Sequence, residues 1–192
     1  MGRACQVQAG QPQAADHPRG CIAKQSLADG IALGDARDAF LKRLHALAHT
    51  HSLLTESAWR GAKLSALVED ELRPYGDHAS FRGQDLILMP KAALTLGLVL
   101  HELATNAAKH GALTEPAGRI EVSWTAEDDI FHLAWREHGG PLVRQPARRG
   151  FGSRLLERAV TYELSGQASL DFSPEGVRYD ITAPLRELVS PA

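Results

Sequence analysis

One long stretch of helix-forming residues constrains the fold of this chain more than any other feature. It runs from Pro90 to Leu113 (PKAALTLGLVLHELATNAAKHGAL) and contains mostly good helix formers. Pro90 suits the first turn of a helix, because it has no N–H to leave unpaired there. Gly111 and the TEPAG sequence after it are typical of a helix end. We therefore expect a long helix, and its neighbours decide which fold it belongs to.

Short strands are predicted on both sides of this helix. Their residues alternate between polar and apolar or form short apolar runs bounded by turn residues. The predicted strands are Ala79–Arg82, Asp85–Met89, Arg119–Thr125, Ile130–Glu137, Ala168–Phe172 and Val177–Ala183, and a further helix is expected over Ser153–Leu164. This order predicts an α+β fold in which a mixed sheet has helices on one face, a two-layer α/β sandwich.

A helical segment is predicted before this domain. Phe40, Leu44, Leu47, His51 and Leu54 follow the spacing of an a/d seam over two heptads. Such a seam favours a partner helix in the same chain or in a second subunit, although packing onto the chain's own domain would give the same pattern. We expect a poorly ordered segment over 1–20, a helical, hairpin-like segment over 21–60, the α/β domain over 61–186 and a tail over 187–192.

Bulk composition excludes few functions. The 192-residue chain is 44% hydrophobic and 23% charged, which is ordinary for a soluble globular protein. Its net charge of −2 gives no argument for binding nucleic acid or a membrane surface. No apolar run approaches the length of a membrane span, and Cys5 and Cys21 both precede the expected core. We expect a cytoplasmic protein with no nucleic-acid partner and no membrane span.

The long helix carries a polar face whose chemistry suits a metal–phosphate site. Glu102, Asn106 and Lys109 lie at positions i, i+4 and i+7, so they share one face. Carboxylate and carboxamide oxygens are hard ligands or water-holders for Mg²⁺, and Lys offers a positive charge to a phosphate. A solvated helix face would show the same pattern, so both interpretations stay open on this helix alone.

Two glycine-containing segments extend the candidate site. Glu137 ends a predicted strand before Gly139 and Gly140, where backbone can approach a ligand closely, and its carboxylate could accept a hydrogen bond from an exocyclic amine. Gly150-Phe151-Gly152-Ser153 precedes a predicted helix, whose free N–H groups form an anion cradle. The loop before it carries cations that suit mobile phosphate contacts or simple solvation, namely Arg144, Arg148 and Arg149.

The order of these segments is more informative than any one of them. A helix with Glu-x-x-x-Asn comes first, then a hairpin ending in Glu-x-Gly-Gly, an Arg-bearing loop, and Gly-x-Gly opening a helix. This order is what an ATP site with a lid requires: metal and phosphates over the long helix, adenine at the acidic turn, and phosphates again at the second helix.

These motifs resemble those of a known superfamily. HELATNAAKHGAL resembles the N box of the GHKL ATPases and histidine kinases, WREHGG their first glycine box, and RRGFGSRLLER the second. The His that opens the N box and the Trp-x-Glu before the glycines are similar to the HWE subfamily of bacterial sensor histidine kinases. RLHALAHTHSLLTESAW resembles the second dimerisation helix of that subfamily. The resemblance covers about Cys21 to Leu185 and implies a Bergerat-type ATP-binding fold after a dimerisation segment.

The resemblance also implies a role for each motif residue. Asn106 would hold Mg²⁺, and Glu102 would polarise the attacking histidine as a general base or an orienter. His101, in the place of the N-box His, is grouped with Glu102 as catalytic, and Trp135 would support the site by packing. Glu137 would read the adenine amino group. The implied ATP-binding set is Asn106, Lys109, Glu137, Gly139, Gly140, Arg149, Gly150, Gly152 and Ser153.

The phosphoacceptor motif of the family, a run like His-Arg-Val-Lys-Asn, is missing from this sequence. CIAKQSLADG resembles the later part of the acceptor helix, and counting back along an ungapped match reaches Gly10. His17 is the nearest histidine, but Pro18 follows it and its neighbours do not match. A shifted reading frame, a wrongly chosen start or a loss of self-phosphorylation would each explain these first residues.

Three interpretations are compatible with the sequence. The first is a two-component histidine kinase that binds Mg-ATP and transfers the γ-phosphoryl group to a histidine and then to a response-regulator receiver domain. It would form a homodimer through helices over 21–57 and take its signal from a separate sensor protein or a missing segment. The second is a degenerate, non-autophosphorylating module that binds nucleotide and docks a response regulator or partner kinase. The third is an ATPase or a protein-Ser kinase, against which the HWE-type residues argue.

Overall fold

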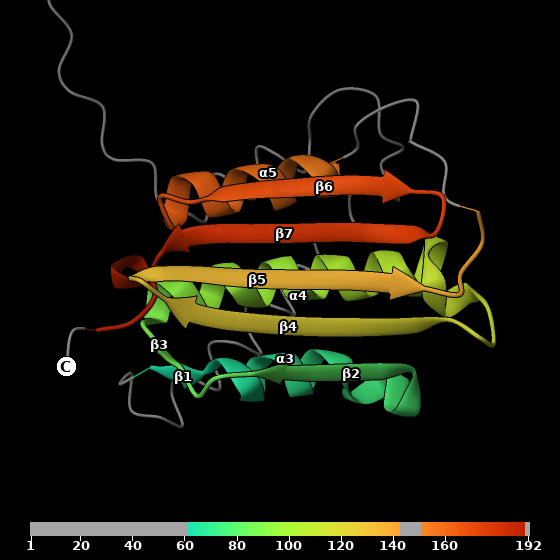
Figure 1. Cartoon of the computed structure of the whole chain (residues 1–192), viewed down its shortest axis with the longest axis horizontal. Helices are drawn as coiled ribbons and strands as arrows, with labels where there is room; N and C mark the ends of the chain where they lie inside the picture. The colour runs from blue at the N-terminus through green and yellow to red at the C-terminus, as the bar shows by residue number, and fades with distance from the viewer. Residues whose placement is uncertain (1–60, 143–150, 191–192) are drawn as a thin grey trace, which may run out of the picture. The chain divides into compact units, whose positions relative to one another are not determined.

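The computed structural model describes residues 61–142 and 151–190, all of which fall within the compact unit Leu41–Ala192. Figure 1 shows their arrangement. The helices are α3 (Leu64–Leu72), α4 (Pro90–His110) and α5 (Phe151–Glu163), with short 3₁₀ helices η1 (Arg73–His78), η2 (Ala112–Thr114) and η3 (Leu185–Glu187). The strands are β1 (Ala62–Lys63), β2 (Ala79–Gly83), β3 (Ile87–Leu88), β4 (Arg119–Glu127), β5 (Ile130–His138), β6 (Gln167–Ser173) and β7 (Gly176–Pro184).

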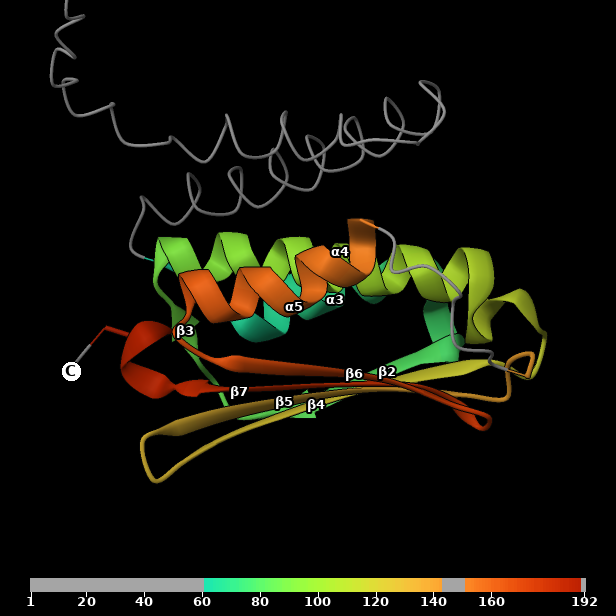
Figure 2. The ribbon, with the colours of Figure 1, turned by 90° about the horizontal axis from the view of Figure 1, so that it is seen from above.

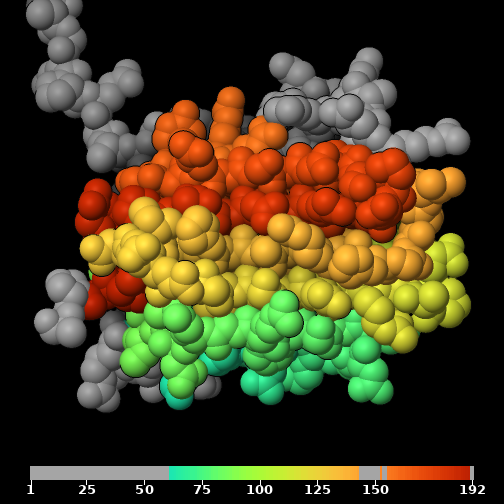
Figure 3. All heavy atoms as spheres, viewed as in Figure 1, coloured from blue at the N-terminus to red at the C-terminus, as the bar shows by residue number. Residues whose placement is uncertain are grey.

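The described residues form two layers. Five strands make one sheet in the order β2-β4-β5-β7-β6, while β1 and β3 form a separate two-stranded ribbon. Helices α3, α4 and α5 lie on one face of the large sheet (Figure 2). On the opposite face the strands lie side by side, from β6 at one edge to β2 at the other (Figure 3). The predicted α+β fold, a two-layer α/β sandwich, is confirmed.

The sheet is mixed, as predicted. β2 pairs in parallel with β4, whereas the β4–β5, β5–β7 and β6–β7 pairs are antiparallel. A parallel pair needs a crossover connection, and α4 supplies most of it between β2 and β4. The long helix that the sequence predicts therefore forms most of the connection between the edge strand β2 and its parallel neighbour β4.

The core fills the space between the sheet and the helices. Alternate residues of β4 and β5 face the helices, as period-two strands require, and these include Phe131 and Trp135, both 0% exposed. On α4 the buried positions recur every three or four residues. They are Ala92, Ala93, Thr95, Leu96, Gly97, Val99, Leu100, Leu103, Ala104 and Ala107.

The ends of α4 match the sequence signals. Pro90 occupies the first turn, and the N–H of Met89 before it donates to the carbonyl of Leu188 at 2.6 Å. At the other end the N–H of Gly111 donates to the carbonyls of Asn106 and Ala107 at 3.0 and 3.2 Å. A Cβ at position 111 would collide with the carboxylate of Glu137, so only glycine fits the point where the helix turns toward β5.

The packing continues beyond residue 186, where the sequence predicted the domain to end. Leu188 is 0% exposed, and Val189 forms an antiparallel bridge with Leu88 of β3. The short ribbon strand β1 was not predicted, because two residues carry no periodicity. Among the described segments, no helix combines the length and the apolarity that crossing a bilayer requires.

Candidate functional site

The last two turns of α4 carry the polar face that the sequence predicted. Leu103 and Ala107 are buried against the core, while Glu102 and Asn106 are partly exposed. Lys109 is exposed on the final turn. Because a carboxylate and a carboxamide one turn apart project from the same side of the helix, this face offers two hard oxygen groups to a ligand.

The N-terminus of α5 lies against this face. A Cβ at Gly152, the second residue of α5, would overlap Oε1 of Glu102, so the two residues are already in close approach. The positive end of the α5 dipole therefore lies close to the carboxylate of Glu102. The structure brings together one residue from the predicted N box and one from the second predicted glycine segment.

Glu137 lies at the other end of the predicted site, and it is buried. Its side chain is only 4% exposed. Oε2 accepts a hydrogen bond from the N–H of Ala112 at 2.8 Å, and Oε1 accepts one from the indole Nε1–H of Trp135 at 3.2 Å. These bonds tie the end of β5 to the turn after α4. Burial raises the pKa of the Glu137 carboxyl, and the two hydrogen bonds oppose that rise.

The glycines near Glu137 are needed for protein packing. A Cβ on Gly140 would lie 2.5 Å from Cα of Ala112, and one on Gly176 would overlap the carbonyl oxygen of Glu137. Gly139 has a φ of +67°, which a side chain disfavours, and a Cβ there would lie 2.6 Å from the carbonyl oxygen of Ala117. The close backbone approach that the sequence indicated therefore occurs within the chain itself.

His101 contacts a different element from Glu102. Its Nδ1 lies 3.0 Å from Oε2 of Glu71 on α3. Sequence reasoning did not single out Glu71, because 30 residues separate it from His101 and no local pattern joins them. Trp135 was expected to support the site by packing, and the structure adds its hydrogen bond to Glu137.

Several predicted site residues lie outside the described part of the chain. Arg149 and Gly150 fall in the segment 143–150, together with Arg144 and Arg148. The backbone of Ser153 is part of α5, but its side chain is not described. His17 and the predicted dimerisation helices over 21–57 also lie outside the described residues.

The residues present fit a magnesium nucleotide. Glu102 lies beside Gly152 at the start of α5, and Asn106 follows Glu102 one turn later on α4, so both carry side-chain oxygens of the kind that Mg²⁺ prefers. Among the described residues, no group of three or more His, Cys, Asp or Glu side chains could hold a metal without further ligands. Mg²⁺ keeps several waters and takes substrate phosphates as ligands, so one or two protein oxygens suffice.

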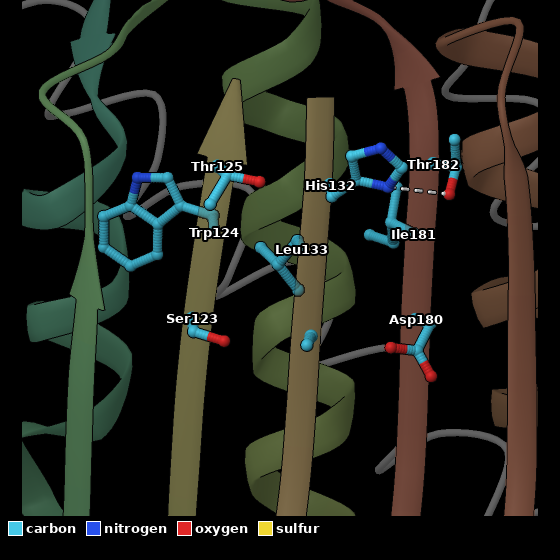
Figure 4. A pocket seen from close by; sticks show the side chains of 9 residues that line it. Ser123, Trp124, Thr125, His132, Leu133, Asp180, Ile181 and Thr182 are labelled. Atoms are coloured by element: carbon cyan, nitrogen blue, oxygen red, sulfur yellow. Dashed lines mark hydrogen bonds between the residues drawn. The ribbon is translucent and has the colours of Figure 1, made fainter. Parts of the chain in front are cut away.

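A hollow on the opposite face of the sheet contains none of the predicted site residues. It has a volume of about 280 Å³ and is lined by residues of β4, β5 and β7. Figure 4 shows Ser123, His132 and Asp180 around it, with a hydrogen bond of 3.2 Å between His132 and Thr182. A second hollow of about 360 Å³ lies between η1 and the turn after α4, lined by Tyr75 and His78 among others. The motif residues of α4 and α5 line neither hollow.

Solved structures of histidine kinases share this fold. The histidine kinase domain of a blue-light activated histidine kinase from Erythrobacter litoralis superposes with a TM-score of 0.63 at 16% identity, covering 88% of this chain and 82% of that domain. A longer structure of the same Erythrobacter litoralis kinase gives 0.65 at 17% identity, covering 92% of this chain and 62% of the other. The fold is therefore that of a histidine kinase catalytic domain.

Sequence comparisons find similarity to one family of histidine kinases. The model of the HWE histidine kinase family matches residues 20–85. A blue-light-activated histidine kinase from Brucella anthropi is 36% identical over 178 residues, and one from Brucella ovis is 35% identical over 178 residues. The chain is similar to the HWE family of histidine kinases, the family that its motifs resemble. The match covers 88% of this chain but only 36% of the length of either relative.

Proposed function

We propose that this chain is the ATP-binding and phosphotransfer part of a two-component histidine kinase. It binds Mg-ATP, transfers the γ-phosphoryl group to a histidine, and passes the phosphate to a response-regulator receiver domain. The observation that carries the proposal is the approach of Gly152 on α5 to the carboxylate of Glu102 on α4. Two motifs that are far apart in the sequence meet there, at a helix N-terminus suited to phosphate.

The phosphate end of the proposed site uses the polar face of α4. The carboxamide oxygen of Asn106 holds Mg²⁺, and the ammonium group of Lys109 contacts a phosphate. Backbone N–H groups at the start of α5 donate hydrogen bonds to phosphate oxygens beside Gly152. Bound Mg²⁺ would neutralise charge that develops on the transferred phosphoryl group. Positioning and charge neutralisation supply most of the catalysis in such a transfer.

Glu102 acts on the attacking histidine in this proposal. Its carboxylate is partly exposed and lies beside the phosphate end of the site. It accepts the proton of the attacking imidazole or orients that ring through a hydrogen bond. Both roles need the ionised, acceptor form of the carboxylate.

The adenine end of the proposed site lies at the end of β5. The family resemblance gives Glu137 the task of reading the adenine amino group. Both of its oxygens already accept hydrogen bonds, from Ala112 and Trp135, but each carboxylate oxygen has capacity for a second. Glu137 therefore shapes the turn beside the base and offers its remaining lone pairs to the amino group. Gly139 and Gly140 keep that turn close to β5.

The remaining parts of the proposal concern residues outside the described ranges. Arg149 and Gly150 would close over the phosphates as part of a lid. The segment 21–60 would dimerise through helices over 21–57, ahead of the α/β domain. A response-regulator receiver domain is the proposed phosphate recipient, and a separate sensor protein would supply the signal.

The test is incubation of the chain with γ-labelled ATP and Mg²⁺, followed by a search for an acid-labile, base-stable phosphoprotein. Nucleotide binding is measured in parallel with a fluorescent ATP analogue. Asn106→Asp should abolish both the label and the Mg²⁺-dependent binding, because it replaces a neutral oxygen ligand with a charge that repels phosphate. Glu121→Gln on the open face of the sheet is the matched control and should behave as wild type. A wild-type chain that binds no nucleotide would contradict the proposal.

The second candidate function is a degenerate module that binds nucleotide and docks a response regulator or partner kinase. The missing acceptor motif favours it, since His17 does not lie in a matching run. Nucleotide binding that depends on Asn106, without any acid-labile label, would support this function over autophosphorylation. If label appears, replacement of His17 tests whether that residue is the acceptor. A label stable to acid would point instead to a protein-Ser kinase.

A further inference from the structure

His101 joins the long helix α4 to the short helix α3, one residue before Glu102. The 3.0 Å contact between Nδ1 of His101 and Oε2 of Glu71 is partly shielded from solvent, with side chains 26% and 14% exposed. Adjacent residues on a helix point about 100° apart. His101 therefore faces α3, while Glu102 on the neighbouring position faces the start of α5.

The surroundings of the His101 imidazole give its two nitrogens different roles. An ionised carboxylate only accepts hydrogen bonds, so Nδ1 of His101 must carry a proton to bond Glu71. Nε2 of the same ring is buried and has no hydrogen-bond partner among the described residues. The geometry thus makes Nδ1 the nitrogen that donates to Glu71 and leaves Nε2 as a buried polar atom without a partner among the described residues.

A second contact joins the same two regions. The hydroxyl of Tyr75 in η1, just after α3, donates to the carbonyl of Ala104 on α4 at 3.3 Å. Burial, followed by the charge of Glu71, raises the pKa of the Tyr75 hydroxyl. The α3–η1 segment therefore holds α4 at residues 101 and 104, on the turn that also carries Glu102 and leads into Asn106.

We propose that His101 is a positioning residue for the candidate nucleotide site. By donating Nδ1–H to Glu71, it fixes the rotation of the α4 turn that presents Glu102 and Asn106 to Mg-nucleotide. This inference rests on the proposed function. If His101 served only the stability of the fold, hydrogen bonds at both ring nitrogens would be more favourable. The unpaired Nε2 costs free energy, and a purely stabilising role does not explain that cost. The proposal gives the N-box histidine of this chain a role distinct from contact with the substrate.

The test measures the affinity of the full 192-residue chain for a fluorescent ATP analogue, with and without Mg²⁺. Partners that orient metal-binding groups are typically worth about 10-fold to 100-fold in metal affinity. His101→Gln removes the donor at the Nδ1 position, so the gain in affinity that Mg²⁺ provides should fall about 10-fold, with Mg²⁺-free affinity little changed. His101→Asn places an amide N–H where Nδ1 stood, and it should retain most of that gain.

A double-variant comparison ties the effect to Glu71. Glu71→Ala should lose the Mg²⁺-linked affinity to the same extent as His101→Gln, and combining the two changes should cost no more than either alone. The matched control is Lys91→Ala, which removes the 3.4 Å ion pair that joins the far end of α4 to Glu163 of α5. That control should leave both affinities unchanged.

A spectroscopic readout tests the pairing without any nucleotide. Long-range ¹⁵N–¹H correlation spectra of the chain should show the proton of His101 on Nδ1, and Glu71→Ala should change that signal. Three results would overturn the positioning role. His101→Gln could lose affinity equally with and without Mg²⁺, or it could lose none. Alternatively, His101→Gln could retain the Mg²⁺-linked affinity while His101→Asn loses it. If the wild-type chain binds no nucleotide, the proposed function is wrong. The spectra then test only the hydrogen bond between His101 and Glu71.

Discussion

Two glutamates of the candidate site lie in opposite environments. Glu137 is 4% exposed and accepts hydrogen bonds from Ala112 and Trp135, so it joins a strand to the turn after a helix. Glu102 is partly exposed and lies beside the glycine that opens α5. A glutamate therefore has a structural role at one end of the site, and we propose that another glutamate has a catalytic role at the other end. Variants of the two should separate stability from activity.

The largest expected effect is on phosphoryl transfer, through Glu102. Glu102→Gln keeps the size of the side chain but removes its basicity, so the transfer rate at saturating Mg-ATP should fall about 100-fold or more. The free energy of unfolding should change little, because the group is partly exposed. Rates from γ-labelled ATP and urea unfolding curves measure the two quantities, with Glu121→Gln as the control. An unchanged rate in a folded variant would remove Glu102 from the chemistry.

The next effect is on stability, through Glu137. Glu137→Ala leaves the N–H of Ala112 and the indole N–H of Trp135 without their acceptor in a buried place. The expected loss in free energy of unfolding is about 3 kcal/mol, because each unpaired buried donor costs roughly 1–3 kcal/mol. Urea unfolding followed by circular dichroism measures it, beside the exposed Glu121→Ala. A loss as small as that of the control would mean that water replaces the carboxylate without cost.

The smallest effect is a pH dependence that Glu137 should show. Its pKa in the folded chain is raised above the ordinary value of 4.5, mainly by burial. Between the ordinary and the raised pKa, the folded chain binds the proton while the unfolded chain has released it, so stability falls as pH rises. Above the raised pKa the loss is complete and stability levels off.

Glu137→Gln removes this titration and provides the comparison. The stability of wild type minus that of the variant should therefore decrease as pH rises from about 4.5 upward. Thermal unfolding in a series of buffers measures this difference, with Glu121→Gln as the reference for exposed carboxylates. A difference that increases with pH would mean that the two hydrogen bonds outweigh burial.

Local patterns in the sequence predicted most of the elements. Helix α4 begins at Pro90 and ends before Gly111, and both hairpins lie where alternating residues and turn signals placed them. These features depend on neighbours only a few residues apart. The parallel pairing of β2 with β4 had no such signal, because α4 and its flanking segments separate the two strands.

The candidate site was predicted as a set of residues but not as a set of contacts. The motif order predicted that Glu102 and Gly152 serve one site, and the structure brings them together. The contacts of His101 with Glu71 and of Glu137 with the backbone of Ala112 span 30 and 25 residues. They depend on how the helices pack on the sheet, which periodicity does not encode.

The place of β7 has a consequence for synthesis of the chain. This strand lies between β5 and β6 in the sheet, and the residues after it bring Val189 to Leu88 and Leu188 into the core. During translation the earlier strands leave the ribosome with one side of β5 unpaired. An unpaired strand of this kind can bind other chains until its partner arrives. The nascent domain therefore stays exposed to misassembly until β7 and the residues through Val189 have emerged.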